Sequence, residues 1–220
     1  MKIFLGSAVL AEVAWAADAG LADGVMTTPA QLHDEGGADT RGLIQDLCRA
    51  SAGPVVVSVE SVRSDDMYRD GRELARLSDQ VVVEVPLVED GVAAIRRLST
   101  DGVRVAASLV YSPAQALLAA KAGATAVSCA LQQLDAEGHY GLQVVEEIRA
   151  VFDAAGMECD VLAATATSAS DFTRCVLAGA DGVVLTPETL RALLVHPLTD
   201  RGVDRLLNTL SRLPKGRFTS

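Results

Sequence analysis

Short apolar runs alternate with amphipathic segments along the whole chain. Five of the runs consist largely of Val, Leu, Ile and Ala, and they cover residues 2–5, 54–59, 81–86, 103–110 and 159–164. Because few polar residues interrupt them, these runs are typical of parallel strands that are buried on both faces. Three of the segments between them repeat apolar residues at helical spacing, over 112–123, 141–156 and 168–179. The pattern predicts strands and helices in alternation.

One local motif predicts three further strands. It reads AGLADGVM at 19–26, AGATAVSC at 122–129 and AGADGVVL at 178–185. In each copy an amphipathic stretch rich in Ala and Leu ends at the Gly, which suits the position just after a helix, and a short apolar run follows. The motif marks the joint between a helix and the next strand, and it brings the predicted strands to eight.

Eight strands alternating with helices in 220 residues predict an α/β fold, a single (β/α)8 barrel domain over 1–220. A doubly wound open sheet is the alternative, but no GxGxxG follows a strand, so a nucleotide-binding version lacks support. One more helix is expected beyond the eighth strand, at about 200–212. Its apolar stripe consists of Leu206, Leu207, Leu210 and Leu213. We expect this stripe to pack on the barrel or on a neighbouring subunit.

The composition excludes several classes of partner. Half of the residues are apolar and only 4% are aromatic, so a sizeable core must be built from Val, Leu and Ala. The net charge of −10 disfavours nucleic acid and anionic membranes as partners. No run reaches the roughly 18 apolar residues that a membrane helix needs. Glu12 and Asp18 interrupt the apolar start of the chain, so we predict a cytoplasmic protein without a signal peptide.

Cysteines and histidines show no metal-binding pattern. Cys48, Cys129, Cys159 and Cys175 form no CxxC pair, and His33, His139 and His196 lie far apart in the sequence. We therefore expect reduced thiols, no metal and no organic cofactor. Cys129 is interpreted as a small core residue rather than a nucleophile, since no His lies close to it in the sequence.

A carboxylate interrupts the most apolar predicted strand. The run VVVEVP at 81–86 places Glu84 among valines, where an unpaired charge is costly. Active sites of this fold gather at the carboxyl ends of the strands, and Glu84 is the clearest charged residue on a predicted strand. One interpretation pairs it structurally with Arg104 on the next strand. The other, which we favour, is a carboxyl group with a raised pKa that gives and takes a proton near neutrality.

Other polar residues near the predicted strand ends are mostly hydroxyls and amides. The candidates for substrate binding are Thr28, Ser58, Ser108, Gln133, Thr165 and Thr167. The threonines have an alternative interpretation, because Thr27, Thr28, Thr165 and Thr186 all precede predicted helices, where Thr commonly caps the first turn. The candidates together predict a polar pocket with little charge.

Four stretches resemble the small bacterial transaldolases and fructose-6-phosphate aldolases. MKIFLGSAVLAEVAWAADAGLADGVMTTPAQL is similar to their opening, and LVYSPAQALLAAKAGATAVS matches them almost residue for residue. LDAEGHYG and HPLTDRGVDRLL match as well. The resemblance covers nearly the whole chain and implies the barrel. It also implies a ring-shaped homo-oligomer, a pentamer or decamer, in which the C-terminal helix clasps a neighbour.

The chain departs from this resemblance at the positions that carry the family's chemistry. The Schiff-base lysine of V-V-V-K-I-P corresponds to Glu84, and the strand 3 glutamate to Ser58. The other replaced positions are Gly6, Thr28, Ala106, Ser108, Gln133 and the segment 165–167. The family's two phosphate-binding arginines correspond to Gln133 and Thr167. Lys2, Lys121 and Lys215 are the only lysines, and none is expected at the pocket.

These replacements lead to three hypotheses. The first and favoured one is a barrel that has lost Schiff-base chemistry and uses Glu84 as general acid or base on a small, non-phosphorylated carbonyl or unsaturated substrate. Its reaction would be that of an isomerase, dehydratase, cyclase or lyase, in specialised metabolism. The second is a non-catalytic binding or scaffold protein. The third is residual aldolase activity through another residue.

Overall fold

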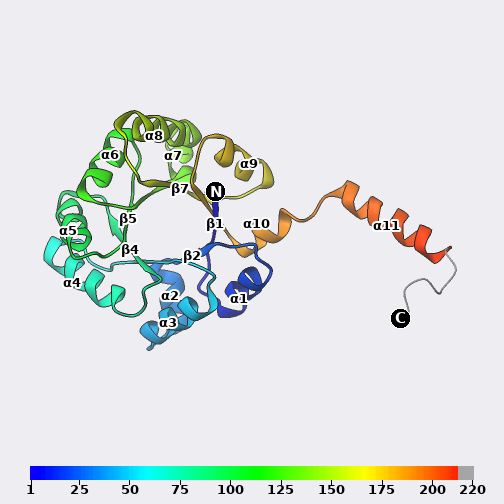
Figure 1. The fold of residues 1–220 in the computed structure, drawn as a ribbon, viewed down its shortest axis with the longest axis horizontal. Helices are drawn as coiled ribbons and strands as arrows, with labels where there is room; N and C mark the ends of the chain where they lie inside the picture. The colour runs from blue at the N-terminus through cyan, green and yellow to red at the C-terminus, as the bar shows by residue number, and fades with distance from the viewer. Residues whose placement is uncertain (213–220) are drawn as a thin grey trace.

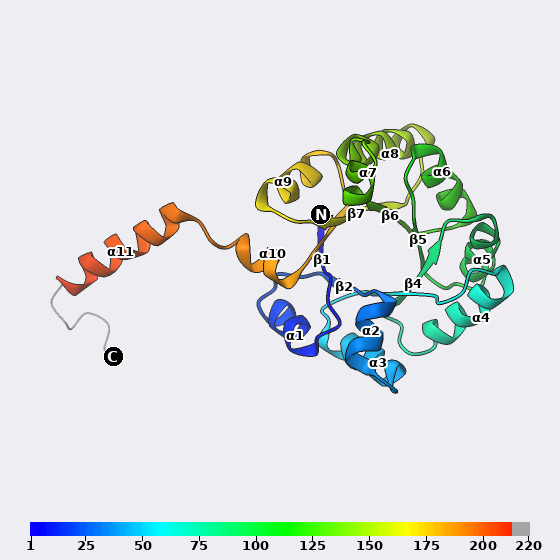
Figure 2. The ribbon, with the colours of Figure 1, turned by 180° about the vertical axis from the view of Figure 1, so that it is seen from behind.

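The strands close into a parallel barrel. The computed structural model describes residues 1–212, except the side chain of Thr165. Eight parallel strands follow one another around the barrel in chain order, and β8 pairs with β1 (Figure 1, Figure 2). They are β1 (Lys2–Leu5), β2 (Gly24–Met26), β3 (Val55–Ser58), β4 (Val81–Pro86), β5 (Val105–Ser108), β6 (Ala126–Ala130), β7 (Asp160–Ala166) and β8 (Gly182–Leu185). The predicted (β/α)8 barrel is confirmed.

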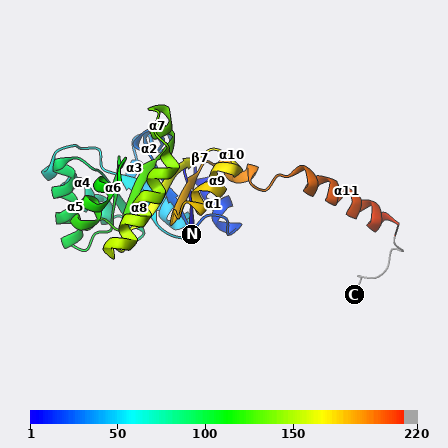
Figure 3. The same ribbon diagram turned by 90° about the horizontal axis from the view of Figure 1, so that it is seen from above.

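Eleven helices are described, and all but the last surround the barrel on its outside (Figure 1). They are α1 (Leu10–Asp18), α2 (Pro29–Gly36), α3 (Thr40–Ala50), α4 (Ser64–Ala75), α5 (Glu89–Thr100), α6 (Pro113–Ala122), α7 (Leu131–Ala136), α8 (Gly141–Ala155), α9 (Ala169–Leu177), α10 (Pro187–Ala192) and α11 (Pro197–Ser211). Two helices follow β2, β6 and β8, whereas one helix follows each of the other strands. The short helix α7 lies at the end of the barrel opposite the N-terminus (Figure 3).

Three glycines end helices as the repeated motif predicts. Gly20, Gly123 and Gly179 have φ angles of 65°, 106° and 85°. These left-handed values cost little only for a residue without a Cβ, and they turn the chain from α1, α6 and α9 towards the next strand. The strand of the run 103–110 is shorter than predicted and ends at Ser108, because Leu109 adopts a φ of 57°.

The strands contribute to two apolar clusters, one between the strands and the surrounding helices and one inside the barrel. Along each strand, alternate side chains point into the barrel and out towards the helices. The inner cluster contains Phe4, Val56, Val82, Ala106, Ala126, Leu162 and Val184. Glu84 lies two residues beyond Val82 on β4, so it points into the barrel nearer the carboxyl ends of the strands. The fold therefore places Glu84 where active sites of barrels form.

The last helix lies away from the barrel. Figures 1 and 3 show α11 extending from α10 into open space, and α11 has no buried residue. Its leucines are strongly exposed, with 57% for Leu206, 58% for Leu207 and 52% for Leu210. The expected helix is confirmed, but it does not pack on its own barrel; Leu213 lies outside the described residues. None of the helices described is both long and apolar enough for a membrane crossing.

Candidate active site

A carboxyl and a hydroxyl group form the centre of the candidate site. Ser58 on β3 and Glu84 on β4 are directly paired in register, and the Ser58 hydroxyl donates a hydrogen bond to Glu84 Oε2. Glu84 is only 8% exposed, and Ala106, its neighbour in register on β5, is apolar. Desolvation by burial raises the pKa of Glu84, and the hydrogen bond from Ser58 offsets part of this effect. Glu84 can therefore hold a proton at a pH where an exposed glutamate has lost it.

The alternative ion pair between Glu84 and Arg104 does not form. Arg104 precedes β5 at the amino-terminal end of the barrel, and its guanidinium donates to the carbonyl oxygen of Asp79. The hypothesis of a structural Glu84–Arg104 ion pair is therefore wrong. The residue spacing did not reveal this, because Arg104 and Glu84 lie on neighbouring strands but at opposite ends of the barrel.

Thr28 has a structural partner within its own helix. Its hydroxyl oxygen accepts a hydrogen bond from the Gln31 backbone N–H at 3.2 Å, and the Gln31 side chain accepts one from the Thr28 N–H at 3.0 Å. This capping box begins α2, and Thr186 begins α10 in a similar way. The capping interpretation is confirmed for both residues. Gln31 also donates to the Gly6 carbonyl oxygen at 3.2 Å, which holds α2 against the loop after β1.

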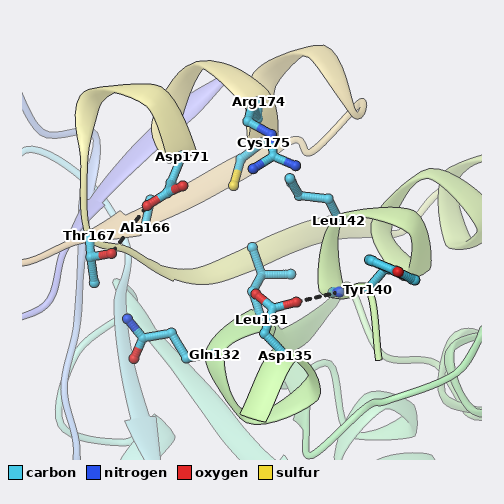
Figure 4. A pocket seen from close by; sticks show the side chains of 11 residues that line it. Leu131, Gln132, Asp135, Tyr140, Leu142, Ala166, Thr167, Asp171, Arg174 and Cys175 are labelled. Atoms are coloured by element: carbon cyan, nitrogen blue, oxygen red, sulfur yellow. Dashed lines mark hydrogen bonds between the residues drawn. The ribbon is translucent and has the colours of Figure 1, made fainter. Parts of the chain in front are cut away.

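The candidate residues after β6 and β7 line two different cavities. Gln133, on α7, accepts a hydrogen bond from the Tyr111 hydroxyl, and both line a cavity of about 500 Å³. Thr167 follows β7 and donates to Asp171 at 3.1 Å. It lines a separate cavity of about 320 Å³ between α7, α8 and α9, whose lining includes Gln132 but not Gln133 (Figure 4). The structure therefore does not bring Gln133 and Thr167 together.

The cavity beside Thr167 contains charged residues that the sequence did not point to. Asp135, Asp171 and Arg174 line it, and Figure 4 shows them on the helices around it. Asp135 accepts a hydrogen bond from the Gly141 N–H at 2.9 Å. These residues lie on helices, where a charged residue normally faces solvent, so a search along the strand ends could not find them.

The remaining candidates lie on the expected strands. Ser108 is the last residue of β5, is half-buried, and is paired in register with Pro86. Thr165 belongs to β7 by its backbone, and its side chain lies outside the described part of the structure. The pairing of β7 with β8 is irregular between Ala163 and Ala166, so this strand bends next to the site.

The described lysines lie away from Glu84. Lys2 begins β1 at the opposite end of the barrel, and its Nζ lies 2.7 Å from Asp160 Oδ2. Lys121 is exposed in the last turn of α6. Lys215 lies outside the described residues.

The thiols do not provide a nucleophile. Cys129 is fully buried in β6, and burial raises its pKa to about 12, so the interpretation as a core residue is confirmed. The other three cysteines are also buried and free. Within residues 1–212 no group of His, Cys, Asp or Glu side chains is arranged to hold a metal ion.

The fold and the position of Glu84 together define the class of protein. It is a closed (β/α)8 barrel with a buried carboxyl group at the carboxyl ends of its strands. One solved structure supports the fold alone. It is a chain of a cube-shaped, highly porous protein cage designed by fusing symmetric oligomeric domains, with a TM-score of 0.59 and 14% identity over 95% of this chain and 76% of that one.

Sequence comparison identifies the family. The family model Transaldolase/Fructose-6-phosphate aldolase matches residues 27–215, and the chain belongs to this family. A probable transaldolase of Thermodesulfovibrio yellowstonii is 35% identical over 98% of this chain and 100% of its own. A probable transaldolase of Petrotoga mobilis is 40% identical over 94% of both chains. One of Hyphomonas neptunium is 39% identical over 94% of this chain and 95% of its own.

These relatives overturn the function predicted from the sequence. The hypothesis of a barrel that has lost its aldolase chemistry, and its alternative of a non-catalytic scaffold, are wrong, because relatives similar over nearly the full chain are named transaldolases. The replaced residues at the strand ends are few, whereas the similarity to these relatives extends over nearly the full chain.

Proposed function

We propose that the protein is an enzyme of the transaldolase class, which breaks and forms a carbon–carbon bond beside the carbonyl group of a small sugar-type substrate. Family membership and the names of the full-length relatives support the class of reaction. The buried Glu84 supports a site for proton transfer at the carboxyl ends of the strands. The proposed position of the site rests on this one residue.

In the proposed reaction, Glu84 is the general base and then the general acid. Its carboxylate takes the proton of the hydroxyl group beside the bond that breaks, and that carbon leaves as an aldehyde. The electron pair of the broken bond moves onto the substrate's own carbonyl oxygen, and the resulting enolate then attacks the acceptor aldehyde. The new alkoxide takes the proton back from Glu84, so atoms and charge balance. Ser58 positions Glu84 through its hydrogen bond, and Ser108 is the proposed donor to the enolate oxygen.

We further propose that Glu84 stands in place of the family's lysine, so that the reaction proceeds without an imine. The positions of Lys2 and Lys121, each far from the carboxyl end of β4, support this assignment. Substrate binding through Thr28, Thr165 and Thr167 is part of the same proposal, whereas Gln133 lines a separate cavity. The Thr28 contribution would come from its position beside the site, since its hydroxyl already caps α2.

The first experiment measures transfer from fructose 6-phosphate to an acceptor aldehyde by the purified full-length protein. Wild type is expected to turn over, and Glu84→Gln is expected to lose at least about 100-fold in kcat, the usual contribution of a general acid–base group. Glu146→Gln, on the exposed face of α8, is the matched control and should keep full activity. A Glu84→Gln variant with unchanged kcat would refute the role of Glu84.

A second measurement tests the absence of an imine. Borohydride reduction in the presence of fructose 6-phosphate should leave the protein mass unchanged, because neither of the two lysines in the described part of the chain, Lys2 and Lys121, lies at the site. A mass increase equal to the reduced substrate adduct would show that a lysine reacts and that the assignment of Glu84 is incorrect.

For partners, we propose a small-molecule substrate and a homo-oligomer held together by α11, with the ring of five or ten subunits that the resemblance implies. The exposed leucine stripe on a helix that does not touch its own barrel supports an intermolecular role. The cytoplasmic location remains a prediction from the sequence.

A further inference from the structure

A further cavity opens at the end of the barrel opposite Glu84. Its volume is about 220 Å³, and it reaches into the inner apolar cluster. Phe4, Ala106 and Ala126 form part of its wall, and Lys2, Arg104 and Asp160 stand at its rim. The amino-terminal end of such a barrel usually contributes to stability and not to ligand binding, because layers of bulky side chains fill it. Here one layer is incompletely filled.

The position of the Phe4 ring explains the space. A Cβ at Gly24 would lie 2.8 Å from the ring, and a Cβ at Gly182 would lie 3.1 Å from it. The two glycines on β2 and β8 therefore make room for the ring on the β1 side of the barrel. On the far side, β5 and β6 carry only Ala106 and Ala126 at this level. The cavity, called the well below, therefore has the Phe4 ring on one side and the methyl groups of Ala106 and Ala126 on the other.

The rim carries an uncompensated positive charge. Lys2 Nζ lies 2.7 Å from Asp160 Oδ2, so these two charges neutralise each other. The Arg104 guanidinium donates to the Asp79 carbonyl oxygen, and in the described part of the chain it makes no ion pair with a carboxylate. Lys2, Arg104 and Asp160 are the charged residues that line the cavity, so its rim has a net charge of +1 by this count. A cationic rim favours an anion, in a chain whose net charge is −10.

We propose that this well binds a small aromatic carboxylate, whose ring enters between Phe4 and the two alanines and whose carboxylate pairs with Arg104. A planar ring fits beside Phe4, because aromatic rings pack favourably in offset or edge-to-face arrangements. A guanidinium group recognises a carboxylate through two parallel hydrogen bonds. The volume admits a compact ligand of one ring and excludes larger ones. The inference does not depend on the proposed function, because Arg104 and Phe4 take no part in the candidate active site, and Ala106, which lies beside Glu84, contributes only a methyl group to this cavity.

Benzoate is the probe for the test, and thermal unfolding of the full-length protein is the first measurement. At a concentration about 100 times its Kd, benzoate should raise Tm by about 7 °C, and the increase should be the same for Glu84→Gln. Benzyl alcohol and benzylamine, which have the ring without the negative charge, should raise Tm much less. Equal shifts for benzoate and benzylamine would refute the role of the positive rim.

Two variants locate the binding. Ala126→Leu fills the well and should abolish the shift by benzoate, and Arg104→Gln keeps the well and should weaken benzoate binding at least tenfold in a calorimetric titration. Arg96→Gln changes an exposed arginine on α5 and is the matched control, with unchanged affinity expected. If Ala126→Leu fails to fold, Arg104→Gln alone decides. An absence of benzoate binding to wild type, or unchanged binding to Arg104→Gln, would overturn the proposal.

Discussion

At the scale of single residues, Glu84 shows how the same side chain can be expensive for stability and useful for chemistry. Its burial among valines and Ala106 raises its pKa, while the Ser58 hydroxyl gives it one hydrogen bond. Burying a carboxylate with a single neutral donor disfavours the charged form. The contribution of Glu84 to the free energy of unfolding should therefore depend on pH.

The first prediction concerns this pH dependence. The ordinary pKa of 4.5 applies to Glu84 in the unfolded chain, and burial raises the folded value above it. The unfolded chain then loses this proton at lower pH than the folded protein, so wild type loses stability as the pH rises from 4.5 through the folded pKa. Glu84→Gln has no proton to lose. Its Tm relative to wild type should therefore rise over that interval, which a series of thermal melts can measure.

A contrary result would be equally clear. A Tm difference between Glu84→Gln and wild type that stays constant from pH 4 to pH 8 would mean that the folded and unfolded pKa values of Glu84 are the same. Glu146→Gln, at an exposed position of α8, serves as the control and should give a constant difference.

At the scale of elements, the joints between helices and strands decide the geometry of the barrel. Gly123 ends α6 with a φ of 106°, and Gly156 ends α8 with a φ of 62°. The two positions share the left-handed backbone but differ in their surroundings. A Cβ at Gly123 would lie 2.3 Å from Ser99 Oγ, whereas nothing lies within 4 Å of one at Gly156. Position 123, in the repeated motif, therefore requires both a left-handed backbone and the absence of a Cβ, whereas position 156, outside the motif, requires only the backbone.

The second prediction separates these two requirements. Gly156→Ala should cost about 1 kcal/mol and lower Tm by about 3 °C, because only the backbone is strained. Gly123→Ala should cost about 3 kcal/mol and lower Tm by about 10 °C, because Ser99 at the end of α5 must also move. Thermal melts of the two variants measure the two decreases in Tm. Equal decreases would show that the contact with Ser99 does not add to the loss of stability at position 123.

At the scale of the whole molecule, the fold of a single chain does not explain why α11 exposes its apolar stripe. Its fifteen residues include no buried one, and Leu198, Leu206 and Leu207 are more than half exposed. An apolar stripe of this size in water favours association. The barrel itself is complete without the helix, since its strands close on their own.

The third prediction tests the proposed role of α11 in assembly. Leu206→Asp combined with Leu210→Asp should convert the protein into a monomer of 22.9 kDa, as measured by light scattering after size exclusion. The barrel should keep its circular dichroism, because α11 does not contribute to its core. Leu177→Asp, at an exposed leucine of α9, is the matched control and should leave the mass unchanged. A wild-type protein that is already monomeric would contradict the proposed oligomer.

Much of the fold could be predicted because it depends on local pattern. Short valine runs are typical of buried strands, and a Gly after an amphipathic stretch can turn into the next strand at little cost. These two signals located eight strands to within a few residues and defined the barrel. They also placed Glu84 on the fourth strand, and the alternation of side-chain direction along that strand puts Glu84 on the same face as Val82.

What only the tertiary structure decided is which side chains meet. Ser58 and Glu84 are 26 residues apart in sequence and share a hydrogen bond because β3 and β4 pair in one register. Arg104 lies at the other end of the barrel, because β5 pairs with β4 in a register that sets Ala106, and not Arg104, opposite Glu84. The sequence by itself determined the elements and their order; the closure of the barrel determined the site, since contacts between strands depend on the register in which segments distant in the sequence pair.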